Sequence, residues 1–61
     1  MVQLPQKRYL DPDELAVTLN MSVRTVYRLA KTKAIPSYRA ARVLRFDLDE
    51  VLEAMRESAA A

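Results

Sequence analysis

The sequence has no cysteine, no histidine, no glycine and no tryptophan among its 61 residues. Without cysteine no disulfide can staple so small a fold, and without cysteine or histidine the usual zinc ligand sets are missing. The commonest general bases and thiol nucleophiles are missing too, and the lack of glycine excludes a glycine-rich phosphate loop. We therefore expect a protein that is not an enzyme and uses no metal, cofactor or small-molecule ligand.

Long apolar segments are also missing. No stretch approaches the roughly 20 apolar residues of a membrane span, and the N-terminus lacks the basic-then-apolar pattern of a signal peptide. The absence of cysteine fits a reducing compartment. We therefore expect a single small domain in the cytoplasm, with no membrane partner and a core too small for a deep substrate pocket.

Acidic residues are missing from the middle of the chain. Between Leu15 and Phe46 the sequence has no acid and seven cations, a charge of +7: Arg24, Arg28, Lys31, Lys33, Arg39, Arg42 and Arg45. Residues 47–61 carry five acids and one arginine (−4), and residues 1–14 sum to −1. A solvated face normally mixes both signs, so this separation predicts one basic surface that binds a polyanion.

Two predicted helices follow each other closely near the N-terminus. Asp11 is a suitable N-cap, Pro12 suits the first helical position, and Glu14 completes a capping box. Asn20 should end this helix, because it tolerates the left-handed backbone conformation. Ser22 then caps a second helix. Only about two residues separate the two helices, as in a helix-turn-helix.

The second helix is predicted to have a packing face and a basic face. At 100° per residue, the packing arc holds Val23, Val26, Tyr27, Leu29 and Ala30. The opposite arc holds Arg24, Thr25, Arg28, Lys31 and Thr32, with Arg28 near its centre. One face therefore packs on the core while the other presents cations.

A β-hairpin is predicted after the second helix. Residues 43–46 alternate, so Leu44 and Phe46 should face the core, as should Tyr38 from the preceding strand. Four scattered aromatic residues are too few for a base-stacking platform. Because residues 40–42 contain no glycine, we expect a longer or a type I turn at the basic tip.

A third helix is predicted to begin at Asp47, with Glu50 as its capping-box partner. Its apolar stripe recurs at i, i+3, i+4 and i+7: Leu48, Val51, Leu52 and Met55. The predicted layout is a flexible arm (1–8), a DNA-binding domain (9–56) and a frayed tail (57–61). The predicted fold is mainly α with a small β-hairpin, a winged helix-turn-helix in the order α-α-β-β-α.

The basic arc of the second helix is the predicted DNA site, because a helix fits the major groove and arginine pairs with guanine edges. The N-terminal part of such a helix reads bases, which nominates Arg24, Thr25 and Arg28. Lys31 and Lys33 are assigned to phosphates. The hydroxyl of Ser22 is either a plain cap or a further phosphate contact.

Flanking residues extend this predicted site. Tyr27 lies at the edge of the packing arc, and we expect it in the core with its hydroxyl emerging towards the DNA backbone. Arg39 and Arg42 occupy the hairpin tip, where arginine suits the negative potential of a narrow minor groove. Arg45 either joins them or pairs with an acid of the third helix.

The sequence resembles the excisionase-like winged helix-turn-helix family, which is related to the MerR-type DNA-binding domain. The likeness rests on Ser-x-x-Thr-Val-Tyr-Arg at 22–28, followed by Ile-Pro at 35–36 and a basic hairpin. It covers about residues 9–55. Where that family commonly has glycine, after the first helix and at the wing tip, this chain has Asn20 and Ala41.

This resemblance implies that the second helix enters the major groove of double-stranded DNA and the hairpin tip the adjacent minor groove. It also implies that several copies associate on neighbouring sites, bend the DNA and help an integrase remove a prophage or mobile element at the nucleoid of a bacterial host. A small transcriptional regulator is the alternative, although a MerR-type regulator continues into a long dimerisation helix. An alternative of another class is a protein-interaction adaptor that uses the acidic face of the third helix.

Overall fold

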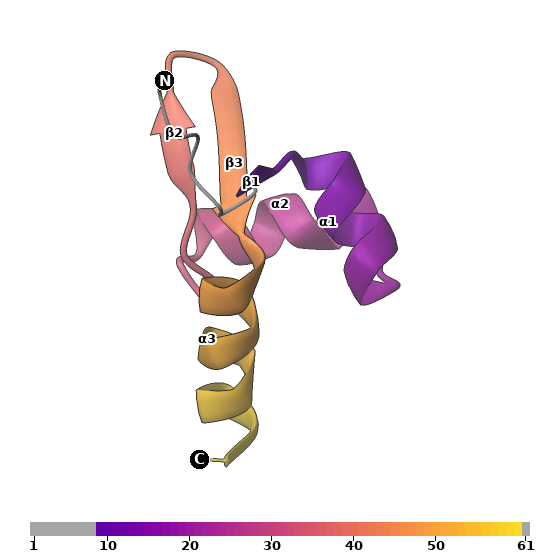
Figure 1. Cartoon of the computed structure of the whole chain (residues 1–61), viewed down its shortest axis with the longest axis vertical. Coiled ribbons are helices and arrows are strands. Elements are labelled where there is room, and N and C mark those ends of the chain that lie inside the picture. The colour runs from indigo at the N-terminus through magenta and orange to yellow at the C-terminus, as the bar shows by residue number, and fades with distance from the viewer. Residues whose placement is uncertain (1–8, 61) are drawn as a thin grey trace, which may run out of the picture.

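The computed structural model describes residues 9–60, apart from the side chain of Ala60. Within this range the chain forms three helices and three short strands (Figure 1): β1 (Tyr9–Leu10), α1 (Pro12–Leu19), α2 (Val23–Lys31), β2 (Tyr38–Ala40), β3 (Val43–Asp47) and α3 (Leu48–Ala60). The predicted class, mainly helical with a β-hairpin wing, is confirmed. The expected arm over residues 1–8 lies outside the described residues.

Helix α1 has the boundaries that its cap residues predict. An oxygen of the Asp11 carboxylate accepts a 2.7 Å hydrogen bond from the Glu14 amide, and Glu14 accepts one of 3.0 Å from the Asp11 amide. Asn20 ends the helix with φ at 56°, in the left-handed region. The Met21 amide then donates to the carbonyl of Ala16 across 2.9 Å, which closes the C-terminal turn.

Helix α2 is followed by the same kind of turn, at a residue whose type does not predict it. Lys33 has φ at 64° although it is neither glycine nor asparagine. Its amide donates to the carbonyl of Ala30, and the Ala34 amide donates to the carbonyl of Leu29, at 3.1 and 2.9 Å. These two bonds satisfy carbonyls that the end of a helix otherwise leaves without partners.

The three strands form one antiparallel sheet in the order β1-β3-β2. Strand β1 was not predicted; it pairs Tyr9 with Asp47 and Leu10 with Phe46. The β2–β3 ladder pairs Ala40 with Val43, so only two residues make the turn. The expected longer or type I turn is therefore wrong.

Only the first of the two turn residues, Ala41, has a positive φ (56°). A positive φ at the first central residue and a negative one at the second is the φ pattern of a type II′ turn. Primed turns match the twist of a hairpin and usually contain glycine.

The core lies between α1, α2, the first turns of α3 and one face of the sheet. Its buried residues are Leu15, Ala16, Val26, Ile35, Leu44, Phe46 and Val51. Four residues expected in the core are instead partly exposed: Val23, Tyr27, Tyr38 and Leu52. Each lies at the edge of its helix or on the outer face of the sheet, and the domain has too few elements to cover those flanks.

Helix α3 projects from the body, opposite the tip of the hairpin along the longest axis of a molecule measuring 44 × 26 × 19 Å (Figure 1). Asp47 caps it, because an oxygen of its carboxylate accepts a 3.0 Å hydrogen bond from the Asp49 amide. The helix runs to Ala60, past the expected boundary at residue 56. No helix in the described range is long and apolar enough to cross a membrane.

Candidate nucleic-acid interface

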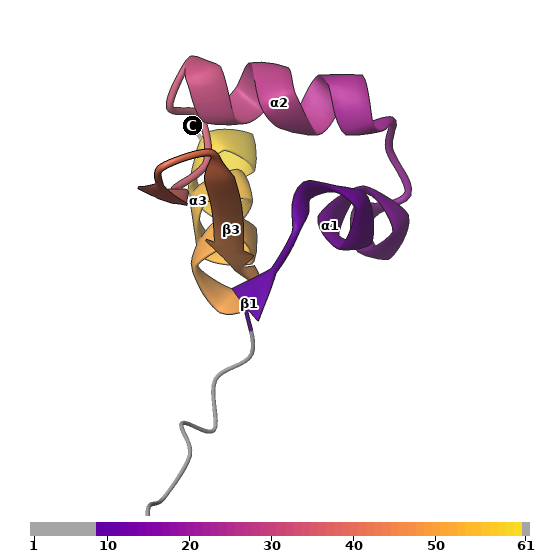
Figure 2. The same cartoon turned by 90° about the horizontal axis from the view of Figure 1, so that it is seen from above.

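Helix α2 lies along one edge of the domain, with its outer side uncovered (Figure 2). A narrow stripe anchors it: Val26 is fully buried, and Leu29 and Ala30 are half-buried. Cationic side chains at i, i+4 and i+7 are exposed on another face of the helix: Arg24, Arg28 and Lys31. The predicted basic face is therefore present and open to solvent, while its contact with DNA stays a prediction.

The N-terminus of α2 is organised by Ser22. The Ser22 hydroxyl oxygen accepts a 3.1 Å hydrogen bond from the Thr25 amide, so its predicted role as an N-cap is confirmed. The two hydroxyl groups of Ser22 and Thr25 also lie 2.9 Å apart and share a hydrogen bond. Thr25 is half-buried, whereas its neighbour Arg24 is exposed. Of the residues assigned to base edges, the two arginines are therefore the more accessible.

Tyr27 is more exposed than predicted, with 52% of its surface accessible. It lines a hollow between α2 and the wing, whose walls come from Pro12, Tyr27, Arg39, Ala41, Arg42, Val43, Leu44 and Arg45. The expectation of a core position is wrong, because α2 packs through Val26 and turns the Tyr27 flank towards the hairpin. The structure thus brings Tyr27 together with the wing cations Arg39 and Arg42.

A second hollow links the C-terminal end of α2 to the wing. Its lining includes the cations Lys31, Lys33 and Arg39, together with the buried Ile35. Arg39 lines both hollows. Lys31 and Lys33 therefore share one surface with the wing through Arg39. Four other predicted site residues line neither hollow: Ser22, Arg24, Thr25 and Arg28.

The cations of this surface are not neutralised by acids of the described chain. The ion pair found within residues 9–60 joins Arg56 and Glu53 of α3, at 3.9 Å. Arg45 donates a 2.8 Å hydrogen bond to the Leu44 carbonyl, and no acid of α3 in this range pairs with it. The alternative of an ion pair between Arg45 and the third helix is therefore wrong, and the basic charge stays available to a polyanion.

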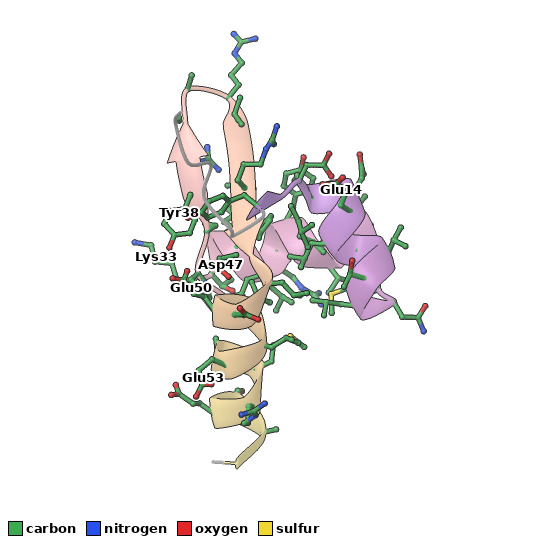
Figure 3. The ribbon with its side chains drawn as sticks, in the orientation of Figure 1. Glu14, Lys33, Tyr38, Asp47, Glu50 and Glu53 are labelled. Carbon is green, nitrogen blue, oxygen red and sulfur yellow. The ribbon has the colours of Figure 1, made fainter. Side chains whose placement is uncertain are left out.

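Sequence reasoning missed the position of Tyr38 at the base of the wing (Figure 3). Its hydroxyl donates a 2.7 Å hydrogen bond to Oε1 of Glu50, and this bond raises the pKa of Tyr38. Glu50 therefore bonds the wing from the first turn of α3. No local signal connects two residues that are twelve positions apart.

Comparison with known proteins places this arrangement in a family. No curated protein matches the sequence, and no solved structure matches the fold. The profile of the helix-turn-helix domain family matches residues 9–59, which span all the helices and strands described above except the last residue of α3. Such a domain implies that DNA is the partner of the chain. The chain belongs to the helix-turn-helix domain family.

Proposed function

We propose that the protein binds double-stranded DNA sequence-specifically, with α2 in the major groove and the β2–β3 wing in the adjacent minor groove. The observation that carries this proposal is the acid-free stretch of seven cations, which falls on the exposed face of α2 and on the wing. An unopposed basic surface on a protruding helix suits the phosphate backbone. In this proposal the protein acts in the cytoplasm. It acts by binding alone, since the sequence has no histidine or cysteine for the commonest kinds of catalysis.

The side chains divide between two tasks in this proposal. Arg24, Thr25 and Arg28 read base edges from the N-terminal half of α2, and each bidentate arginine–guanine pair supplies about 1–3 kcal/mol of discrimination. The remaining residues hold the backbone and the minor groove: Ser22, Tyr27, Lys31, Lys33, Arg39 and Arg42. The four cations among them, if all lie on phosphates, give a slope of log K against log salt of roughly −4.

The two tasks can be separated with Arg28→Ala and Lys31→Ala, two single-charge changes on the same face of α2. A duplex selected from a random library is titrated between about 50 and 200 mM salt, a range over which such contacts weaken strongly. Lys31→Ala should reduce the salt slope by about 1 for every duplex. Arg28→Ala should in addition relax the preference at one base pair by about 1–3 kcal/mol.

Arg56→Ala is the matched control, because it removes the same charge from α3, where Arg56 is exposed and faces Glu53. Its effect on affinity and slope should be well below that of Lys31→Ala. An equal effect of all three variants would show that only net charge matters. Binding that is independent of salt would refute the proposed interface.

We further propose that the protein is an excisionase of a phage or mobile element, which binds adjacent sites, bends the DNA and directs integrase-mediated excision. The support is the resemblance carried by residues 22–28, 35–36 and the basic hairpin. One small domain should bind a single site weakly, so tight occupancy would need several copies or a partner protein.

Footprinting on attachment-like repeats beside an integrase gene tests this finer proposal. A ladder of regularly spaced protected sites, together with bending measured by the mobility of circularly permuted fragments, is expected. One isolated palindromic site without bending would instead indicate a small transcriptional regulator. Both outcomes leave the binding of double-stranded DNA intact, so the two levels of the proposal are tested independently.

A further inference from the structure

The wing is attached to the domain mainly through one strand. Strand β2 lies at the edge of the sheet, its three residues are exposed, and its ladder with β3 has three residue pairs. Short two-stranded ribbons twist readily and have little stability of their own. The ladder alone therefore does not fix the angle at which the hairpin leaves the domain.

Tyr38 supplies a second attachment at the base of β2. Its hydroxyl donates the 2.7 Å hydrogen bond to Glu50 in the first turn of α3. Its ring meets that of Tyr9 in β1 edge-on, with the centroids 5.6 Å apart and the planes at 79°. Figure 3 shows Tyr38 and Glu50 where the hairpin meets α3. These contacts join β2 to two elements with which it forms no ladder.

The Glu50 end of this attachment is rigid. The next residue, Val51, is fully buried, which fixes the first turn of α3 against the core. A carboxylate acceptor makes the hydrogen bond stronger than one between neutral groups. The raised pKa of Tyr38 has this bond as its largest cause, in agreement with the geometry.

We propose that the Tyr38–Glu50 hydrogen bond is a latch that holds the wing at the angle from which Arg39 and Arg42 reach DNA. Tyr38 is then a positioning residue, since its hydroxyl acts through the two arginines that follow it. This inference rests on the proposed function, because it presupposes that the wing contacts the duplex.

The size of the effect follows from the population of the latched wing. Loss of one hydrogen bond lowers the ratio of latched to unlatched wing by roughly two- to tenfold. The apparent dissociation constant rises as the binding-competent fraction falls. Tyr38→Phe should therefore weaken binding by up to about tenfold, provided that the wing cations are present to benefit from the latch.

The test is a cycle on the full chain, measured by fluorescence anisotropy with a duplex that the wild type binds. Tyr38→Phe is made in the wild type and in the Arg39→Ala, Arg42→Ala background. Several-fold weakening is expected in the first background and less than twofold in the second. Tyr9→Phe is the control, because it removes the hydroxyl of the ring that packs against Tyr38. The Tyr9 hydroxyl forms no hydrogen bond within residues 9–60, so this change should leave the affinity unaltered in both backgrounds.

A second pair of variants isolates the acceptor. Glu50→Gln and Glu50→Ala remove the same charge, but only glutamine keeps an oxygen that can accept the tyrosine hydroxyl. Glu50→Ala should therefore bind more weakly than Glu50→Gln by a factor similar to that of Tyr38→Phe. In the free protein, residual dipolar couplings of the hairpin amides should change in Tyr38→Phe and stay unchanged in Tyr9→Phe.

Equal weakening by Tyr38→Phe in both backgrounds, or hairpin couplings that match the wild type, would overturn the latch. Both results would leave the proposed function standing, because the wild type would still bind. A wild type that binds no duplex would instead refute the proposed function itself. The residual dipolar couplings are measured without DNA, so they still test the orientation of the wing if the wild type binds no duplex.

Discussion

The substitution Ala41→Gly tests the conformation of the wing tip. Ala41 is the first residue of the two-residue turn and has φ at 56°. A Cβ atom in the left-handed region costs roughly 1–2 kcal/mol, because it approaches the following carbonyl oxygen. Glycine avoids that cost but loses more backbone entropy on folding, by roughly 0.5–1 kcal/mol. We therefore expect Ala41→Gly to raise the free energy of unfolding by about 0.5–1 kcal/mol.

The neighbouring alanine provides a matched control of opposite sign. Ala40 lies in β2, is exposed, and does not have a positive φ. Ala40→Gly should therefore lower the free energy of unfolding by roughly 0.5–1 kcal/mol, through backbone entropy alone. The two variants have the same composition and differ only in the position of the change.

Urea unfolding followed by circular dichroism measures both variants, with thermal melts alongside. A change of 1 kcal/mol moves the Tm of a domain this small by about 4–8 °C, so the two variants should differ by several degrees. The charge of the wing is unchanged, and the salt dependence of DNA binding should stay that of the wild type. If Ala41→Gly were as destabilising as Ala40→Gly, the left-handed assignment of Ala41 and the tight turn would both be wrong.

Two further outcomes follow from individual hydrogen bonds. Ser22→Ala should lower the free energy of unfolding by about 1 kcal/mol in the same urea experiment, since the Ser22 hydroxyl caps the Thr25 amide, whereas Ser22→Gly should cost only a few tenths. Tyr38 has its pKa raised above the ordinary 10.0, mainly by its hydrogen bond to Glu50, so the folded state holds this proton more tightly than the unfolded state. The stability that the bond supplies is therefore fully present below pH 10 and lost as the pH rises through the raised pKa. Tyr38→Phe should lack this loss in alkaline melts, and an identical alkaline profile for both proteins would contradict the bond.

Local features of the fold were predictable, because their partners lie within one turn of each other. The Asp11–Glu14 capping box and the Ser22 cap each join residues three positions apart. Asn20 was identified for its tolerance of a positive φ. Lys33 has the same conformation without that preference, so its position at the end of α2 is imposed by how the chain packs after the helix. After α1 the residue type and the packing both favour a positive φ, whereas after α2 only the packing does.

Non-local features were not predictable. Strand β1 has two residues, too few to show an alternating pattern, and its partners Phe46 and Asp47 lie far along the chain. The two-residue turn at Ala41 is set by the register of β3, which is paired on both sides. A sequence reading favours a longer turn where glycine is missing, whereas a ladder fixed by Leu44 and Phe46 leaves room for only two residues.

The candidate site was predictable in its charges and less so in its shape. Helical periodicity gives the direction in which a side chain points, but not how wide a stripe the neighbouring elements cover. Val23 and Tyr27 point towards the apolar side of α2 and still keep 37% and 52% of their surface exposed. The exposure of Tyr27 depends on where the hairpin lies, which the sequence of α2 does not encode.

The separation of charge along the chain becomes a separation in space because α3 follows β3 directly and continues away from the tip of the hairpin (Figure 1). The acid-free stretch ends in β3, and the acids of α3 extend away from the wing along the longest axis (Figure 1). A net charge of +2 would attract a duplex only weakly if both signs were mixed over the surface. Because the acids of α3 extend away from the tip of the hairpin, the field of the DNA attracts the wing and repels the far end of α3. We therefore expect the charge distribution to orient the protein during its approach, before any base is read.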